Sequence, residues 1–149
     1  MFSSPIQIRW SDIDSNRHLR HSAYYDYGAM MRMDVLNKNG LTTELFEQSG
    51  FGPILFHEEA FFKREIILED KITIDFECTK ATADYSRWSI RHNIKKDDGT
   101  LAAIIHVDGA WLDLNKRRLI IPQEFVQKVF STFPRSADFQ EIIMTKKEV

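Results

Sequence analysis

Acidic, imidazole and guanidinium side chains are concentrated in the stretch WSDIDSNRHLRH, which covers residues 10–21. Asp12 and Asp14 stand two residues apart, and His18 and His21 stand three residues apart. Such groups are costly to bury without partners, and they are also the groups that enzymes use as acids, bases and nucleophiles. The stretch is therefore either a solvated loop or a reactive loop placed before the apolar segment that follows it.

That apolar segment has helical spacing over residues 22–38, with apolar side chains around most of its circumference. A helix of this kind is usually buried. Ser22 is a candidate N-cap, and Asn39-Gly40 is a candidate stop signal. A second, short helix is expected over residues 42–48, before the sequence SGFGP interrupts regular structure. The reactive groups thus stand directly before a helix that we expect to be buried.

Extended segments dominate the rest of the chain. A short half-buried strand is expected over residues 6–10, and four long strands over residues 54–68, 71–79, 87–95 and 101–114. The sequence DDGT predicts a hairpin turn, NKRR a further turn, and residues 123–130 a short amphipathic helix. One long helix can cover one face of such a sheet, which predicts an α+β domain over residues 1–134. A polar tail over residues 135–149 is expected to be loose.

Composition excludes several classes of protein. The 149 residues are 43% hydrophobic and 28% charged, as in an ordinary globular domain, and the net charge of -2 gives no general attraction to nucleic acid. The pair Lys63-Arg64 is expected to be solvated surface. The single Cys78 excludes an internal disulfide, and we find no zinc-ligand spacing, so no metal or cofactor is expected. No apolar stretch is long enough to span a membrane and no signal peptide is recognisable, which makes a cytoplasmic protein the default expectation.

The order of these features resembles the hotdog-fold acyl-CoA thioesterases of the 4-hydroxybenzoyl-CoA thioesterase type. The resemblance begins with a strand that ends in an aromatic residue, followed by Asp12-Ile13-Asp14, His18, His21 and Tyr24. It continues through GPILFHEEAFF, DDGTLAAIIHVDGAWLDL and RRLIIP, and covers most of residues 5–130. The resemblance implies a hotdog fold, a homodimer or homotetramer with sites at the subunit junction, and an acyl-CoA or another acyl thioester as substrate.

The resemblance also implies a catalytic residue. In the family, the second aspartate of the motif is the catalytic carboxylate, and it corresponds to Asp14. This carboxylate attacks the thioester carbonyl or activates water, and backbone N–H groups at the start of the long helix stabilise the oxyanion. The alternative reading is structural, because an aspartate in such a loop often caps a turn. Asp12 is expected to be a turn or salt-bridge residue.

The neighbouring polar residues receive supporting roles. His18 and His21 correspond to positions that different branches of the family use, and we expect one of them to face the site, with a slight preference for His21. Arg17 stands where the family usually has glycine, and its cation could meet a coenzyme A phosphate. Tyr24 is expected to be a core or cavity-wall residue, with a proton donor as the alternative reading.

Two adjacent glutamates complete the candidate set. Strand alternation sends Glu58 and Glu59 to opposite faces of the sheet. We predict that Glu59 is the one on the helix-covered side, as an active-site or supporting acid.

Two rival functions stay open at this point. A non-catalytic acyl-binding or scaffold protein could keep the same fold, and Arg17 in place of glycine favours that rival. A hotdog dehydratase is a third possibility, but in those enzymes the catalytic histidine and aspartate lie elsewhere. We therefore expect a thioesterase first.

Overall fold

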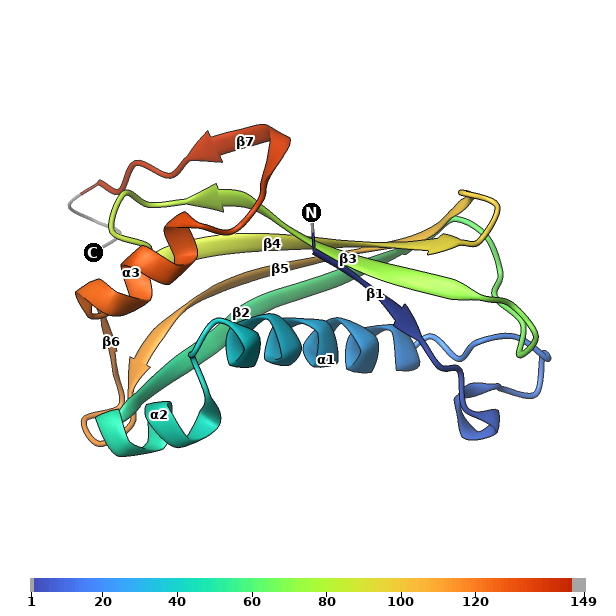
Figure 1. The fold of residues 1–149 in the computed structure, drawn as a ribbon, viewed down its shortest axis with the longest axis horizontal. Coiled ribbons are helices and arrows are strands. Elements are labelled where there is room, and N and C mark those ends of the chain that lie inside the picture. Colours follow the sequence, from blue (N-terminus) through green and yellow to red (C-terminus); the bar gives the residue numbers. More distant parts are fainter. Residues whose placement is uncertain (1, 146–149) are drawn as a thin grey trace.

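The computed structural model describes residues 2–145 and contains one long helix on a curved antiparallel sheet, as Figure 1 shows. The α+β fold expected from the sequence is therefore confirmed. The elements in chain order are β1 (Phe2–Ile6), the 3-10 helix η1 (Trp10–Asp12), α1 (Ala23–Lys38), α2 (Thr43–Ser49), β2 (Phe51–Phe62), β3 (Ile72–Ala81), β4 (Arg87–Lys96), β5 (Leu101–Asp113), β6 (Arg118–Ile120), α3 (Glu124–Ser131) and β7 (Arg135–Glu141).

The strands form a single sheet in the order β1-β3-β4-β5-β2. Neighbours along this path pair antiparallel, β6 adds to β5, and β7 pairs parallel to β3 beyond the end of β1. The four long strands β2 to β5 are those predicted by the period-two pattern, within three residues at each end except that β2 ends at Phe62 and not at residue 68. Strand β2 has twelve residues and lies at the edge of the sheet.

Helix α1 packs along one face of the sheet (Figure 1). Its buried side consists of Ala23, Tyr24, Gly28, Met31 and Val35. At Gly28 the helix approaches the sheet closely, because a Cβ there would lie 3.3 Å from the ring of His92. The predicted helix over residues 22–38 is confirmed to within one residue. Its burial is one-sided, however, since Met30 on the opposite side is 69% exposed.

The predicted strand over residues 6–10 is wrong in position, because β1 ends at Ile6 and the chain enters η1 at Trp10. The cause is local: the backbone N–H of Arg9 donates to Asp12 Oδ2 at 3.1 Å, which bends the chain into a tight turn. The turn predicted at NKRR covers residues 115–118, and its last residue, Arg118, already belongs to β6, which pairs with β5.

The expected loose tail begins with an ordered strand, which corrects that prediction for residues 135–141. Strand β7 pairs with β3, and the carbonyl of Pro134 accepts a hydrogen bond from Cys78 N at 2.8 Å. Arg91 of β4 holds the new strand by an ion pair of 3.2 Å to Asp138. These partners are distant in sequence, so local composition does not reveal them. Residues 146–149 of the predicted tail lie outside the described residues.

The core lies between the sheet and the helices α1 and α3, and aromatic rings fill the end under α3. Phe130 packs against Trp111 at 5.5 Å and against Trp88 at 6.0 Å between ring centroids. Of the helices in residues 2–145, none has the length and apolar character needed to cross a membrane.

Candidate active site

The two aspartates of the loop have different environments, although they are two residues apart. Asp12 is completely buried, whereas the side chain of Asp14 is 26% exposed. Asp12 accepts hydrogen bonds from Arg9 at 3.1 Å and from the hydroxyl of Tyr27 at 2.8 Å. Burial alone would raise the pKa of Asp12, but the bonds from Tyr27 and Arg9 outweigh it and hold that pKa below its ordinary value. Asp12 is therefore the salt-bridge residue that we expected.

Asp14 lies at the start of a tight turn that a small bridge closes. Ile13 and Leu19 pair as an isolated antiparallel bridge, and Asp14 N donates to the carbonyl of His18 at 3.0 Å. Asp14 Oδ1 accepts from Asn16 N at 2.9 Å, which is a common aspartate turn bond. Asp14 Oδ2 lies 3.5 Å from Nδ1 of His18. The turn thus fixes one carboxylate oxygen by a backbone bond and leaves the other beside an imidazole.

Arg17 occupies the tightest point of this turn, with φ of 65°. Its N–H donates to the carbonyl of Asp14 at 3.0 Å. Left-handed backbone favours glycine, because a side chain with a Cβ crowds the carbonyl there. This left-handed conformation explains why glycine suits the position in the family that the sequence resembles. In this chain Arg17 adopts the same conformation, at some conformational cost.

The turn borders a hollow of about 410 Å³ that brings together most of the predicted site residues. Asp14, His18, His21 and Tyr24 all line it, together with the end of β2 and the residues after it. The complete lining is Asp14, Asn16, His18, Leu19, His21, Tyr24, Phe62, Lys63, Arg64 and Glu65. The loop is anchored over the segment after β2, because Leu19 is buried and its N–H donates to the carbonyl of Ile66 at 2.7 Å.

The two histidines differ in their contacts with Asp14. His18 Nδ1 lies 3.5 Å from Asp14 Oδ2 and 3.1 Å from the carbonyl of Leu19. His21 lines the same hollow, and its side chain makes no hydrogen bond or ion pair with any residue from 2 to 145. Both imidazoles therefore face the hollow, and His18 is the one that contacts the carboxylate.

Tyr24 forms a wall of the hollow, as expected. Its side chain is buried, and its ring packs on Phe62 with centroids 4.9 Å apart. Burial, with the negative charge of Asp14 adding to it, raises the pKa of Tyr24 to about 12. The hydroxyl therefore stays protonated at neutral pH and can donate a hydrogen bond into the hollow.

Helix α1 begins at this hollow without a side-chain cap. Ser22 is the N-cap residue, as predicted, but its hydroxyl makes no cap bond and instead contacts the guanidinium of Arg20. The first turn of a helix carries N–H groups without intrahelical partners and the positive end of the helix dipole. The start of α1 can therefore stabilise a negative charge that develops near Asp14.

Three cations around Asp14 have no acidic partner within the described part of the chain. Arg17, Lys63 and Arg64 make no ion pair there, and Arg64 Nη1 donates only to the carbonyl of Lys63 at 2.8 Å. Lys63-Arg64 was expected as ordinary surface, and the sequence carries no signal that it would meet the aspartate loop. The local electrostatics favour an anionic ligand.

Glu59 does not lie where we predicted. It is Glu58 that faces α1, through an ion pair of 3.5 Å to Arg32, while Glu59 pairs with His57 at 3.5 Å on the other face. A bulge between Leu55 and His57 shifts the register of β2, and such a shift changes which residues face the core. Glu59 is also absent from the lining of the Asp14 hollow.

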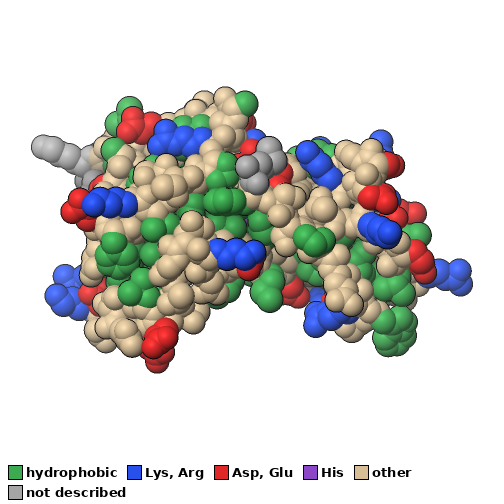
Figure 2. Space-filling model, viewed as in Figure 1, with side chains coloured by type: hydrophobic (Ala, Val, Ile, Leu, Met, Phe, Trp, Pro, Cys, Tyr) green, Lys and Arg blue, Asp and Glu red, His purple; other side chains and the backbone are tan. Residues whose placement is uncertain are grey.

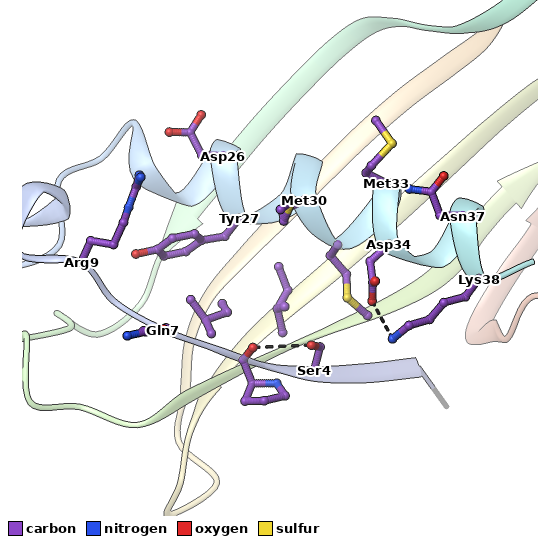
Figure 3. A pocket seen from close by; sticks show the side chains of 14 residues that line it. Ser4, Gln7, Arg9, Asp26, Tyr27, Met30, Met33, Asp34, Asn37 and Lys38 are labelled. Carbon is purple, nitrogen blue, oxygen red and sulfur yellow. Dashed lines mark hydrogen bonds and ion pairs between the residues drawn. The ribbon is translucent and has the colours of Figure 1, made fainter. Parts of the chain in front are cut away.

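A larger hollow of about 720 Å³ lies between β1 and α1, away from Asp14 (Figure 3). Its charged side chains are mostly paired: Lys38 with Asp34 at 2.9 Å, and Arg9 with Asp12 at 3.1 Å. In residues 2–145, no group of three or more His, Cys, Asp or Glu side chains could hold a metal ion. The Asp14 hollow is thus the better candidate for chemistry.

Comparisons with known proteins bear on the family and the fold of the chain. The model of the thioesterase-like superfamily matches residues 8–141, and no curated protein matches the sequence. A Staphylococcus aureus protein solved in complex with CoA is similar in structure with a TM-score of 0.83 at 19% identity, over 98% of this chain and 90% of that one.

Two further similar structures are named for their activity. A DHNA-CoA thioesterase from Staphylococcus aureus has a TM-score of 0.79 at 16% identity, over 87% of this chain and 88% of that one. A 1,4-dihydroxy-2-naphthoyl-CoA thioesterase from Synechocystis has the same TM-score and identity, over 88% of this chain and 96% of that one. At these identities the likeness shows the fold, which confirms the hotdog architecture predicted from the sequence.

Proposed function

The chain belongs to the thioesterase-like superfamily, and from this premise we propose that it hydrolyses acyl-CoA thioesters with Asp14 as the catalytic carboxylate. The observation that carries the proposal is the hollow in which Asp14, a neutral Tyr24 and the uncapped start of α1 meet. A thioester carbonyl placed there would have a carboxylate on one side and N–H donors on the other. That is the pair of groups that hydrolysis needs.

The proposed reaction starts at the carbonyl carbon of the thioester. Asp14 either attacks this carbon itself or takes a proton from a water molecule that attacks it. The carbonyl oxygen gains negative charge, and the N–H groups at the start of α1 stabilise it. Breaking the C–S bond releases the CoA thiolate, and water supplies the second oxygen of the carboxylic acid product. A bound acyl–Asp14 anhydride, where it forms, is hydrolysed by water.

The unpaired cations support a polyanionic substrate. CoA carries a pyrophosphate and a 3′-phosphate, and both are attracted by Arg17, Lys63 and Arg64. His18, in contact with Asp14, is placed to orient the carboxylate and to exchange a proton with it. His21 is placed to contact substrate at the wall of the hollow. Glu59 has no role in this proposal because it lies on the other face of the sheet.

A homodimer or homotetramer is part of the proposal. Strand β2 offers an unpaired edge of twelve residues, and edge-to-edge pairing between copies would satisfy it. The end of β2 also lines the Asp14 hollow through Phe62, so a partner at this edge would lie near the site.

A thiol-release assay over a panel of acyl-CoA compounds tests the function. The panel should contain short, long and aromatic acyl groups. Release of CoA with saturable kinetics is the expected result. Tight binding of acyl-CoA without turnover of any member would instead support a non-catalytic acyl-CoA-binding protein.

A further inference from the structure

Arg20 closes the aspartate loop, although the proposed chemistry gives it no role. Its backbone N–H donates to the carbonyl of Asp12 at 2.8 Å, and its Nε donates to the carbonyl of Ser11 at 3.4 Å. Arg20 is absent from the lining of the Asp14 hollow. It therefore holds the two ends of the loop together without touching the space in which we expect the substrate.

The same residue also contacts the start of α1. The carbonyl of Arg20 accepts a hydrogen bond from Ala23 N at 3.1 Å, and Arg20 Nη1 donates to the hydroxyl of Ser22. Arg20 Nη2 lies 3.6 Å from a carboxylate oxygen of Asp26, in the first turn of the helix. Arg20 thus joins the aspartate loop to the end of the helix that faces the hollow.

Ser22 differs from an ordinary N-cap residue. An N-cap serine or threonine usually has an extended backbone, and its side-chain oxygen accepts an N–H of the first turn. Thr42 at the start of α2 does this, with ψ of 159° and a bond of 3.1 Å from Leu45 N. Ser22 instead has a helical backbone with ψ of -22°, and its hydroxyl is engaged by Arg20. The N–H groups at the start of α1 are therefore not capped by this side chain.

The charge of Arg20 is compensated where it stands. Its guanidinium lies 3.6 Å from the carboxylates of both Asp12 and Asp26. Figure 2 shows basic and acidic side chains close together at the end of the molecule where η1 lies in Figure 1. The individual contacts of Arg20 therefore matter more for the site than a general positive field.

We propose that Arg20 is a positioning residue, which holds Ser22 out of the capping position and so keeps first-turn N–H groups of α1 free for the oxyanion. The inference rests on the proposed function and deepens it, because it explains how the start of the helix stays available to substrate. Without the guanidinium, the hydroxyl of Ser22 is free to accept the N–H of Tyr24 or Tyr25, as an N-cap serine does. The oxyanion would then lose a donor.

The kinetic test combines Arg20→Ala with Ser22→Ala. Arg20→Ala should lower kcat by roughly 10²-fold, the cost of one lost oxyanion donor, and should change KM little, because the oxyanion exists only in the transition state. Adding Ser22→Ala removes the competing hydroxyl and should restore kcat by about tenfold or more. Ser11→Ala, added in the same way, is the matched control and should restore nothing, since the Ser11 hydroxyl makes no hydrogen bond within residues 2–145. Failure of Ser22→Ala to restore kcat would overturn the proposal, because the lost contacts to Asp12 and Asp26 would then explain the defect.

Thermal unfolding tests the same inference without any substrate. Ser22→Ala removes no cap bond from the native protein, so Tm should not fall. In the Arg20→Ala background the same change should lower Tm by about 2–4 °C, because the cap bond that forms there is lost. An equal effect of Ser22→Ala in both backgrounds would refute the role of Arg20. The expected difference in a protein that hydrolyses no acyl-CoA would refute the proposed function and leave the control of Ser22 by Arg20 standing.

Discussion

The hydroxyl of Tyr27 donates a hydrogen bond of 2.8 Å to Asp12 Oδ2, so helix α1 holds the buried aspartate of the loop. The two residues are fifteen positions apart in the chain. Because Asp12 is fixed by α1 and by Arg9, the turn that follows is presented at a defined place beside the start of the helix. Asp14 is left facing the hollow, with one oxygen beside His18.

Tyr27→Phe should lower the free energy of unfolding by about 1–3 kcal/mol, because it leaves a buried carboxylate short of one donor. Chemical denaturation measures the loss. Tyr25→Phe is the control, since the Tyr25 hydroxyl has no hydrogen bond within residues 2–145 and its removal should change stability little. Equal stability of both variants would contradict the role of the Tyr27–Asp12 bond.

Asp14→Asn should lower kcat by roughly 10²–10⁴-fold, because the variant loses the charge that acts as nucleophile or base. Asparagine keeps the volume and the turn bond to Asn16, so thermal unfolding should barely change. Asp98→Asn is a matched control: Asp98 makes the same 2.9 Å turn bond, to Thr100 N, at the β4–β5 hairpin. Near-normal turnover of Asp14→Asn would assign Asp14 to the turn alone.

Arg17→Gly should raise the free energy of unfolding by up to about 1 kcal/mol, because glycine adopts the left-handed backbone without strain. Arg117→Gly tests the same effect away from the site, since Arg117 has φ of 56° in the turn between β5 and β6. Only Arg17→Gly should raise KM for a CoA thioester. A rise in KM for both variants would show that the loss of charge at Arg17 is not the cause.

Stability should decrease as the pH falls from about 6.5 toward 3, in part because of His92. Burial, with the neighbouring Arg32 adding to it, lowers the pKa of His92 from 6.5 to about 3. The unfolded chain therefore binds a proton in this range that the folded protein does not, and stability rises with pH there. Arg32 donates to His92 Nε2 at 3.1 Å, and His92 Nδ1 donates to the carbonyl of Asp75 at 2.8 Å, which is the arrangement of a neutral ring.

His92→Asn should flatten the dependence of the unfolding free energy on pH between 7 and about 4, as measured by urea denaturation at several pH values. The comparison concerns slopes, so a general loss of stability in the variant does not obscure it. An unchanged slope would show that other groups cause the acid sensitivity.

Light scattering at micromolar concentration should report a dimer or a tetramer, because β2 exposes its outer edge. Phe56→Lys, at the bulge of β2 where the side chain is 63% exposed, should shift the protein toward monomer. Ile143→Lys is the control and should leave the assembly unchanged. A monomeric native protein would contradict both the assembly and a site shared between subunits.

Local patterns in the sequence determined the long helix, the four long strands and the aspartate motif. Helical spacing and alternation are properties of neighbouring residues, and they located α1 to within one residue and β2 to β5 to within a few at most ends. The turn chemistry of Asp14 is equally local, since its partners Asn16 and His18 lie within four positions. These features depend on interactions between residues that are close in the sequence, so they can be predicted from the sequence alone.

Tertiary structure alone decided which groups meet. Because of the bulge in β2, Glu58 and not Glu59 faces α1. The alternation of apolar and polar residues does not predict where a bulge occurs. Strand β7 is stabilised by pairing with β3 and by the ion pair of Asp138 with Arg91, and both partners lie more than forty residues away in the sequence. Lys63 and Arg64 joined the aspartate loop because Leu19 is anchored to Ile66. Each of these outcomes depends on contacts between distant segments, and a one-dimensional pattern does not contain their geometry.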